Sequence, residues 1–275
     1  MIQYEILALK ESLDAETIKK FRKFLKKFKT FQDATLEKVS AVLLEYLDEN
    51  GAILLSDTLS VRIREIVSEQ GKQLVTDERE FVRGLLEDVY SDAATRNEKV
   101  IGFKPDFSLV RQEMIDRAVK APIDGKTFSS RIWKNTNALA QRIHNDVVDM
   151  VREGKRPNEI SRQIKKDFGS SAYEAERLVR TESAKVQTAA QMDVYESSGV
   201  VSEVEWCSTL EQNTCDICGA MDGKRFKLGE APDLPHPMCR CTLLPVIDGY
   251  ESRTRADNET KRTIDYIDWQ NWKKH

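Results

Sequence analysis

The side chains best suited to chemistry lie close together near the end of the chain. All five cysteines of the 275-residue sequence fall between residues 207 and 241. Two pairs there have the spacing of metal ligands, Cys215 with Cys218 and His236 with Cys239. Two thiolates three residues apart can reach one ion from a tight turn, and three Cys with one His form a set that suits tetrahedral Zn²⁺. The segment therefore predicts a zinc-knuckle-like cluster.

The fourth ligand of this cluster has two candidates, because Cys241 follows Cys239 by two residues. Alternate residues of an extended segment point to opposite sides, so we expect one of the two not to bind. Cys207 falls on an expected strand and is assigned to the core. The alternative is unligated thiols, with or without one disulfide. Four protein ligands leave no open coordination position, so the predicted zinc is structural.

The chain lacks the residue sets of common hydrolytic enzymes. Its only histidines are His144, His236 and His275. An HNH-type nuclease needs a general-base histidine beside acidic or amide metal ligands, and here His236 would have to be both structural ligand and base. The sequence also has no glycine-rich phosphate loop, Gly-x-Ser-x-Gly elbow or His-Glu-x-x-His pair. We therefore expect a protein that is not an enzyme.

Composition favours a helical globular protein without a membrane span. Charged residues make up 32% of the chain and the formal net charge is −3, which argues against a globally basic nucleic-acid binder. No apolar run approaches the roughly 18–20 residues that cross a bilayer, and the first residues lack the order of a signal peptide. We expect a cytoplasmic site of synthesis, where reducing conditions favour metal over disulfides.

The N-terminal region, residues 1–105, is expected to be helical. Ile18, Phe21, Leu25 and Phe28 recur at helical spacing. The same stretch carries seven basic residues and no acid: Lys19, Lys20, Arg22, Lys23, Lys26, Lys27 and Lys29. The alternatives are a solvated basic face, contact with DNA phosphates or an acidic partner, and a membrane-surface helix.

Glycines and a capping pattern suggest where these helices end. Helices are expected over 36–50, 59–74 and 78–97, with breaks at Gly51 and Gly71. A long helix with an apolar face follows the turn at residues 124–125 and ends at Gly154. A short helix over about 157–168 comes next, and Ser171 with Glu174 forms a capping box that predicts a new helix over about 172–198.

The pattern then changes from helix to strand. Residues 201–206 alternate, residues 222–223 form an Asp-Gly turn that leads into a strand through Phe226, and residues 241–247 predict a third strand. The fold class is therefore α+β and predominantly helical, with a helix-plus-small-antiparallel-sheet domain over 106–247 closed by the Cys/His cluster. Residues 248–275 form a charged tail whose three aromatic residues predict a terminal helix packed on the protein: Tyr266, Trp269 and Trp272. An exposed aromatic anchor for a partner is the alternative.

Three segments in order resemble the head morphogenesis family of tailed bacteriophages, the minor head proteins related to protein F of phage Mu. They are GKTFSSRIWKN at 125–135, RLVRTESAKVQTAA at 177–190, and the cysteine-rich segment that ends PHPMCRCTLLP at 235–245. The resemblance covers about residues 125–247. It marks six residues as structural motif positions: Arg180, Thr181, Glu182, Trp206, Asp222 and Gly223. We expect Arg180 and Glu182 to bridge the long helix to neighbouring segments.

This resemblance implies a minor capsid protein of the virion or procapsid, assembled in the host bacterial cytoplasm. Its implied partners are the portal protein and the major capsid protein, with packaged double-stranded DNA as a further candidate and no membrane. The implied role is head assembly, or DNA packaging and delivery. The rivals are a metal-dependent nuclease or nucleotide-transferring enzyme acting on the host, and a simple DNA-binding module that uses the basic N-terminal helix.

Overall fold

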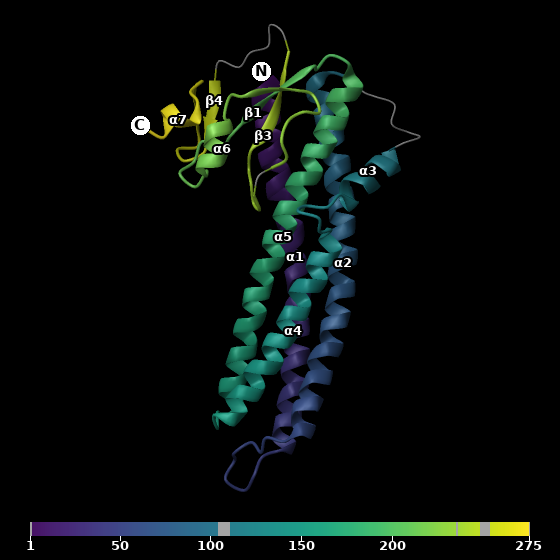
Figure 1. Ribbon diagram of the computed structural model, residues 1–275, viewed down its shortest axis with the longest axis vertical. Helices are drawn as coiled ribbons and strands as arrows, with labels where there is room; N and C mark the ends of the chain where they lie inside the picture. The colour runs from purple at the N-terminus through teal and green to yellow at the C-terminus, as the bar shows by residue number, and fades with distance from the viewer. Residues whose placement is uncertain (1, 104–110, 235, 248–253, 275) are drawn as a thin grey trace. The chain divides into compact units, whose positions relative to one another are not determined.

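The computed structural model describes residues 2–103, 111–234, 236–247 and 254–274. Its fold is predominantly helical, with one three-stranded and one two-stranded antiparallel sheet (Figure 1). The helices are α1 (Ile2–Glu45), α2 (Asp57–Ile101), α3 (Arg111–Lys120), α4 (Phe128–Arg152), α5 (Pro157–Ser198), α6 (Asp216–Met221) and α7 (Trp269–Trp272). The strands are β1 (Glu203–Cys207), β2 (Arg225–Lys227), β3 (Thr242–Val246), β4 (Thr254–Asp257) and β5 (Arg262–Asp265).

The chain divides into two compact units, each built from separated stretches of sequence. Unit 1 contains residues 1–18, 85–121 and 180–275, and unit 2 contains residues 19–84 and 122–179. Helices α1, α2 and α5 each contribute residues to both units. The boundaries expected near 105 and 248 fall beside or on residues outside the described ranges, so those boundaries stay predictions. None of the described helices has the length and apolar character that a bilayer span requires.

Unit 2 is a helical bundle with an aromatic core. Phe24 stacks on Phe81 at a centroid distance of 4.4 Å, and Phe21 and Phe28 pack beside Phe24. Helix α4 begins at the N-cap Thr127, whose side chain accepts a hydrogen bond from the amide of Ser130. Of the five residues expected on its apolar face, Met150 is only partly buried, whereas four are buried: Leu139, Ile143, Val147 and Val151. The amphipathic pattern thus predicted this helix and its buried side correctly.

Three expected divisions between helices are wrong. Helix α1 is continuous from Ile2 to Glu45, so no separate helix begins at residue 36. Helix α2 continues through Gly71, where a β-carbon would lie 3.7 Å from side-chain atoms of Thr136 and Ala140. Helix α5 is likewise continuous through Ser171, which is buried inside it and starts no new helix. A glycine costs a helix interior about 1 kcal/mol, and packing in a bundle outweighs such a local cost. Gly51, with a φ of +74°, does lie in a turn between helices.

The small sheet of unit 1 follows the sequence pattern closely. The strand order is β2-β1-β3, and all pairings are antiparallel. Trp206 on the central strand is buried and lies opposite Leu243 of β3. Pro245 is accommodated because β3 is an edge strand, where a missing amide donor costs no ladder bond. Helix α5 contacts this sheet where Gln191 donates to the carbonyl of Leu243.

The C-terminal residues form a hairpin with a short helix rather than one terminal helix. Strands β4 and β5 pair within unit 1, and α7 contains only four residues. Trp269 is buried, whereas Tyr266 is 41% exposed and Trp272 donates through its ring nitrogen to Asp257. The spacing of three had predicted a longer helix. Strand β5 instead ends at Asp265, directly before Tyr266, so only Trp269 and Trp272 lie in α7.

Candidate metal centre and the ion pair beside it

The first pair of candidate ligands is set by the start of α6. Cys215 is the N-cap of this helix, with extended backbone angles, and its Sγ accepts from the amide of Cys218 at 3.4 Å. The turn therefore places both sulfurs on the same side. Gly219 is required for a reason that sequence reasoning missed, because a β-carbon there would lie 2.0 Å from the ring of Trp269.

The second pair comes from a tight turn before β3. Met238 has a φ of +63°, and the amide of Cys239 donates to the carbonyl of His236 at 3.3 Å. Nδ1 of His236 lies 2.9 Å from the carbonyl oxygen of Pro237. Since a carbonyl only accepts, Nδ1 carries the hydrogen and Nε2 keeps its lone pair for a metal. A fixed tautomer of this kind is typical of metal-binding histidines.

Cys218 joins the two arms. Its Sγ lies 3.2 Å from Nε2 of His236 and 3.7 Å from Sγ of Cys239. Two overlapping groups of potential ligands share it, each with its ligand atoms within 4.8 Å of one another: Cys215, Cys218 and His236, and Cys218, Cys239 and Cys241. Two sulfurs bound tetrahedrally at about 2.3 Å from zinc lie about 3.8 Å apart. The donor atoms are therefore positioned to bind a metal ion.

The expectation that Cys239 and Cys241 point to opposite sides is not what the structure shows. Both sulfurs lie within 4.8 Å of Cys218. The alternation rule applies to extended strand, and β3 begins only at Thr242, after the turn and coil that contain both cysteines. Five candidate ligand residues thus surround a site that a tetrahedral ion would fill with four.

Proton sharing among the sulfurs explains why the cluster suits a cation. Hydrogen bonds from the thiols of Cys218 and Cys239 lower the pKa of Cys241 to about 3. The same interaction with Cys241, together with burial, raises the pKa values of Cys218 and Cys239. These opposite shifts favour a thiolate at Cys241 beside two protonated thiols. A divalent ion supplies the positive charge that allows further thiols to lose their protons.

Cys207 stands apart from both ligand groups. It is buried in the core of unit 1, and burial raises the pKa of its thiol to about 12. Its Sγ accepts from the guanidinium of Arg255 at 3.6 Å. The assignment of Cys207 to the core agrees with this position.

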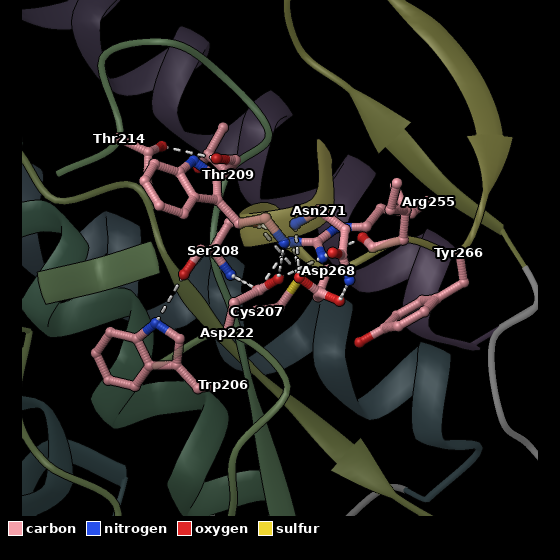
Figure 2. A network of polar contacts seen from close by, with 12 residues as sticks. Trp206, Cys207, Ser208, Thr209, Thr214, Asp222, Arg255, Tyr266, Asp268 and Asn271 are labelled. Carbon is pink, nitrogen blue, oxygen red and sulfur yellow. Dashed lines mark hydrogen bonds and ion pairs between the residues drawn. The ribbon is translucent and has the colours of Figure 1, made fainter. Parts of the chain in front are cut away.

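Unit 1 also contains a buried ion pair, drawn with its polar contacts in Figure 2. Arg255 of β4 binds Asp222 through two parallel bonds, Nη1 to Oδ2 at 2.7 Å and Nη2 to Oδ1 at 2.9 Å. Both side chains are at most 2% exposed. The carboxylate also accepts from the backbone amides of Ser208 and Trp269, each at 2.7 Å. Asp222 thus joins the segment after β1, the hairpin and α7.

This network continues to the turn that carries Cys215 and Cys218. The hydroxyl of Ser208 donates to the carbonyl of Cys218 at 2.6 Å and accepts from the ring nitrogen of Trp206 at 3.2 Å. Gly223 has a φ of +76°, and its amide donates to the carbonyl of Trp206 at 2.8 Å. The predicted Asp-Gly turn is therefore present, with an additional role for Asp222 as the buried acceptor. No sequence pattern singled out Arg255.

The Arg-Thr-Glu motif of α5 reaches the second ligand arm. Oγ1 of Thr181 accepts from the amide of Met238 at 3.2 Å, which fixes the turn between His236 and Cys239. Glu182 is 1% exposed, and its Oε2 accepts from Lys185 at 2.8 Å. Arg180 is half-buried, and the bridging role expected of its side chain stays a prediction.

The seven basic residues of α1 are all exposed and belong to unit 2, whereas the ligand cluster belongs to unit 1. They take no part in the candidate metal centre.

Replacement of Arg255 by Met should strongly destabilise unit 1. The carboxylate of Asp222 would remain buried without its charge partner, a change that costs about 3–5 kcal/mol. Urea unfolding followed by tryptophan fluorescence should show a lower midpoint. The double variant Asp222→Asn, Arg255→Met should lose less than the sum of the two single variants, because contacting partners are coupled.

Arg225→Met is the matched control. Arg225 binds Glu205 at 3.2 Å, but its side chain is 48% exposed, and such a surface pair contributes no more than about 1 kcal/mol. An equal loss in the Arg225 and Arg255 variants would contradict a special role for the buried pair.

A protein family and a curated protein match parts of this chain. Residues 141–244 match the family described as phage Mu protein F like protein. The curated relative is the NAD(+)--arginine ADP-ribosyltransferase EFV of Enterococcus faecalis (strain ATCC 700802 / V583), 29% identical over 182 residues. The match covers 60% of this chain and 37% of that protein, so the chain spans little more than a third of the relative's length. No solved structure matches.

The family match contains two of the three resembling segments whole or nearly whole. It covers the Arg-Thr-Glu region of α5, the first ligand pair and the second ligand pair through Leu244. The segment at 125–135 lies before it. Residues 141–244 of this chain therefore resemble the phage Mu protein F like family.

Proposed function

We propose that the protein is a minor capsid protein of a tailed phage or prophage. The match of residues 141–244 to the phage Mu protein F like family supports a role in head morphogenesis and carries this proposal. Within that role, the chain associates with the portal and major capsid proteins and acts in head assembly, or in DNA packaging and delivery. Its site is then the procapsid or virion, after synthesis in the host bacterial cytoplasm.

The candidate metal centre serves this function as a structural zinc site. Cys215, Cys218 and His236 supply three ligands, and Cys239 or Cys241 supplies the fourth. A closed set of four ligands holds the ion without an open position for substrate. The ion fastens α6 to the turn before β3 where the intervening segment has little core of its own, and metal affinity then adds to folding stability.

An enzyme that transfers nucleotides is the second candidate, because the matched relative carries the name of an ADP-ribosyltransferase. The match covers only 37% of that relative, so the part outside the match can carry the named activity. A nuclease that uses His236 as a base is disfavoured by geometry. Its free Nε2 faces the sulfur of Cys218 at 3.2 Å and is thus committed to the cluster.

Protein purified without chelator should contain about one zinc per chain by elemental analysis. Cys218→Ser should lose the metal and lower the melting temperature, because Cys218 belongs to both ligand groups. Cys207→Ser is the matched control, a buried cysteine outside both groups that should keep its zinc. Cys239→Ser and Cys241→Ser identify the fourth ligand. Metal-free wild-type protein, or full zinc in Cys218→Ser, would overturn the site.

Affinity capture of a tagged chain from cells that produce the encoding phage should recover portal and major capsid proteins. In a sedimentation gradient the chain should move with procapsids, whereas the same chain made in phage-free cells should stay in the light fractions. Procapsids that form normally while the chain remains in the light fractions would contradict the proposal.

The enzyme candidate is tested by incubating the zinc-loaded protein with NAD⁺ and arginine-containing acceptor proteins. We expect neither NAD⁺ consumption nor labelled acceptor. A rate that disappears in His236→Ala, with the melting curve retained, would instead establish catalysis at the cluster.

A further inference from the structure

The charge of the chain is divided unequally between its two units. Unit 2 contains 24 Lys and Arg against 19 Asp and Glu, whereas unit 1 contains 19 against 27. The net charge of −3 thus combines about +5 on unit 2 with −8 on unit 1. An asymmetry of this kind is a reason to search unit 2 for a polyanion surface.

The basic stretch of α1 has an outward stripe opposite its core side. Phe21, Phe24 and Phe28 are at most 4% exposed and define the buried direction. With about 100° between successive residues, three lysines lie on the opposite side of the helix: Lys19, Lys23 and Lys26. All three are exposed. They therefore point away from the bundle.

Ion pairs identify the helices on either side of this stripe. Arg22 lies 4.0 Å from Glu176 of α5, and Lys27 lies 3.9 Å from Asp77 of α2. These distances are long, and such exposed pairs stabilise by no more than about 1 kcal/mol. They nevertheless show that α5 borders the Arg22 side of the stripe.

Helix α5 extends the basic surface. The side chain of Gln32 donates to the carbonyl of Lys165, so α1 and α5 run antiparallel here, with Gln32 beside Lys165 and Arg22 beside Glu176. The fully exposed positions of α5 from residue 162 to residue 177 include four cations and one aromatic residue: Arg162, Lys165, Lys166, Gly169, Ser170, Tyr173 and Arg177. The two partly exposed acids of this stretch each lie near an arginine, Glu174 near Arg142 and Glu176 near Arg22. Tyr173 is 65% exposed.

We propose that this two-helix surface binds the phosphate backbone of double-stranded DNA. The fifteen-residue spacing from Arg162 to Arg177 covers about 22 Å of helix axis, or about six base pairs. Lysine and arginine along this length, with a tyrosine hydroxyl between them, are the usual donors to phosphate oxygens. The outward stripe of α1 has no Asn or Gln for reading base edges, so binding is independent of sequence.

An acidic protein surface fits these contacts less well. Protein interfaces depend on a desolvated apolar or aromatic centre and are depleted in lysine, and this surface offers one exposed aromatic residue among many cations. The inference goes beyond the proposed function, since DNA affinity in solution does not depend on incorporation into a capsid.

Fluorescence anisotropy with a labelled 30-base-pair duplex tests the surface in the full chain. The triple variant Lys19→Gln, Lys23→Gln, Lys26→Gln should bind about tenfold more weakly or worse at ~0.1 M salt, because each lost phosphate contact removes about 0.9 from the slope of log K against log salt. The pair Arg162→Gln, Lys166→Gln should also weaken binding. Loss of affinity from α1 alone would contradict a two-helix surface.

The matched control neutralises three other exposed lysines of unit 2: Lys72, Lys126 and Lys134. It changes the net charge equally and should reduce affinity less than twofold. Equal losses of DNA affinity in the control and in the triple variant would mean that affinity depends on the overall charge of the protein and not on this surface. Wild-type protein that binds polyglutamate but not the duplex at low salt would overturn the proposal in favour of an acidic protein partner.

Discussion

The buried pair of Asp222 and Arg255 is the interaction on which the organisation of unit 1 depends. The guanidinium comes from β4 and the carboxylate from the turn after α6, 33 positions apart in the chain. An unpaired charge in such a place costs several kcal/mol, so the hairpin and the turn are stable only together. Asp222 also accepts hydrogen bonds from two backbone amides, one in the segment after β1 and one at the start of α7. One carboxylate thereby fixes four segments.

The turn that carries Cys215 and Cys218 in the candidate metal centre depends on that carboxylate through Ser208. The amide of Ser208 donates a hydrogen bond to Asp222, and its hydroxyl donates one to the carbonyl of Cys218. Ser208 therefore connects the first ligand pair to the buried ion pair. The second arm is held by Thr181 of α5. Neither arm lies on a long regular element, and such a site keeps its geometry only if outer contacts orient the ligands. The F-like motif residues and the C-terminal hairpin thus support the same cluster from different sides.

Sequence reasoning succeeded where the signal is local. The ligand spacings, the Asp-Gly turn, the strand that carries Trp206 and the apolar face of α4 each depend on residues within a few positions of one another. It failed where the local structure depends on contacts with residues far away in the sequence. Gly219 and Trp269 require each other across 50 residues, and Gly71 is packed against α4 rather than ending a helix. Cys239 and Cys241 were separated by a strand rule in a segment that folds as a turn.

The net charge of the whole chain hides the opposite charges of its two units. Helix α1 contributes residues to both units. Between Ile2 and Ile18, α1 carries four acids and one base, and between Lys19 and Glu45 it carries eight bases and three acids. The helix needs no such division for its own stability, since mixed charges at i and i+4 would stabilise it more. Like charges on one exposed face cost a little folding free energy. That cost is explicable if the face is neutralised by a polyanion, which is the physical reason to place the proposed DNA surface on unit 2 and not on unit 1.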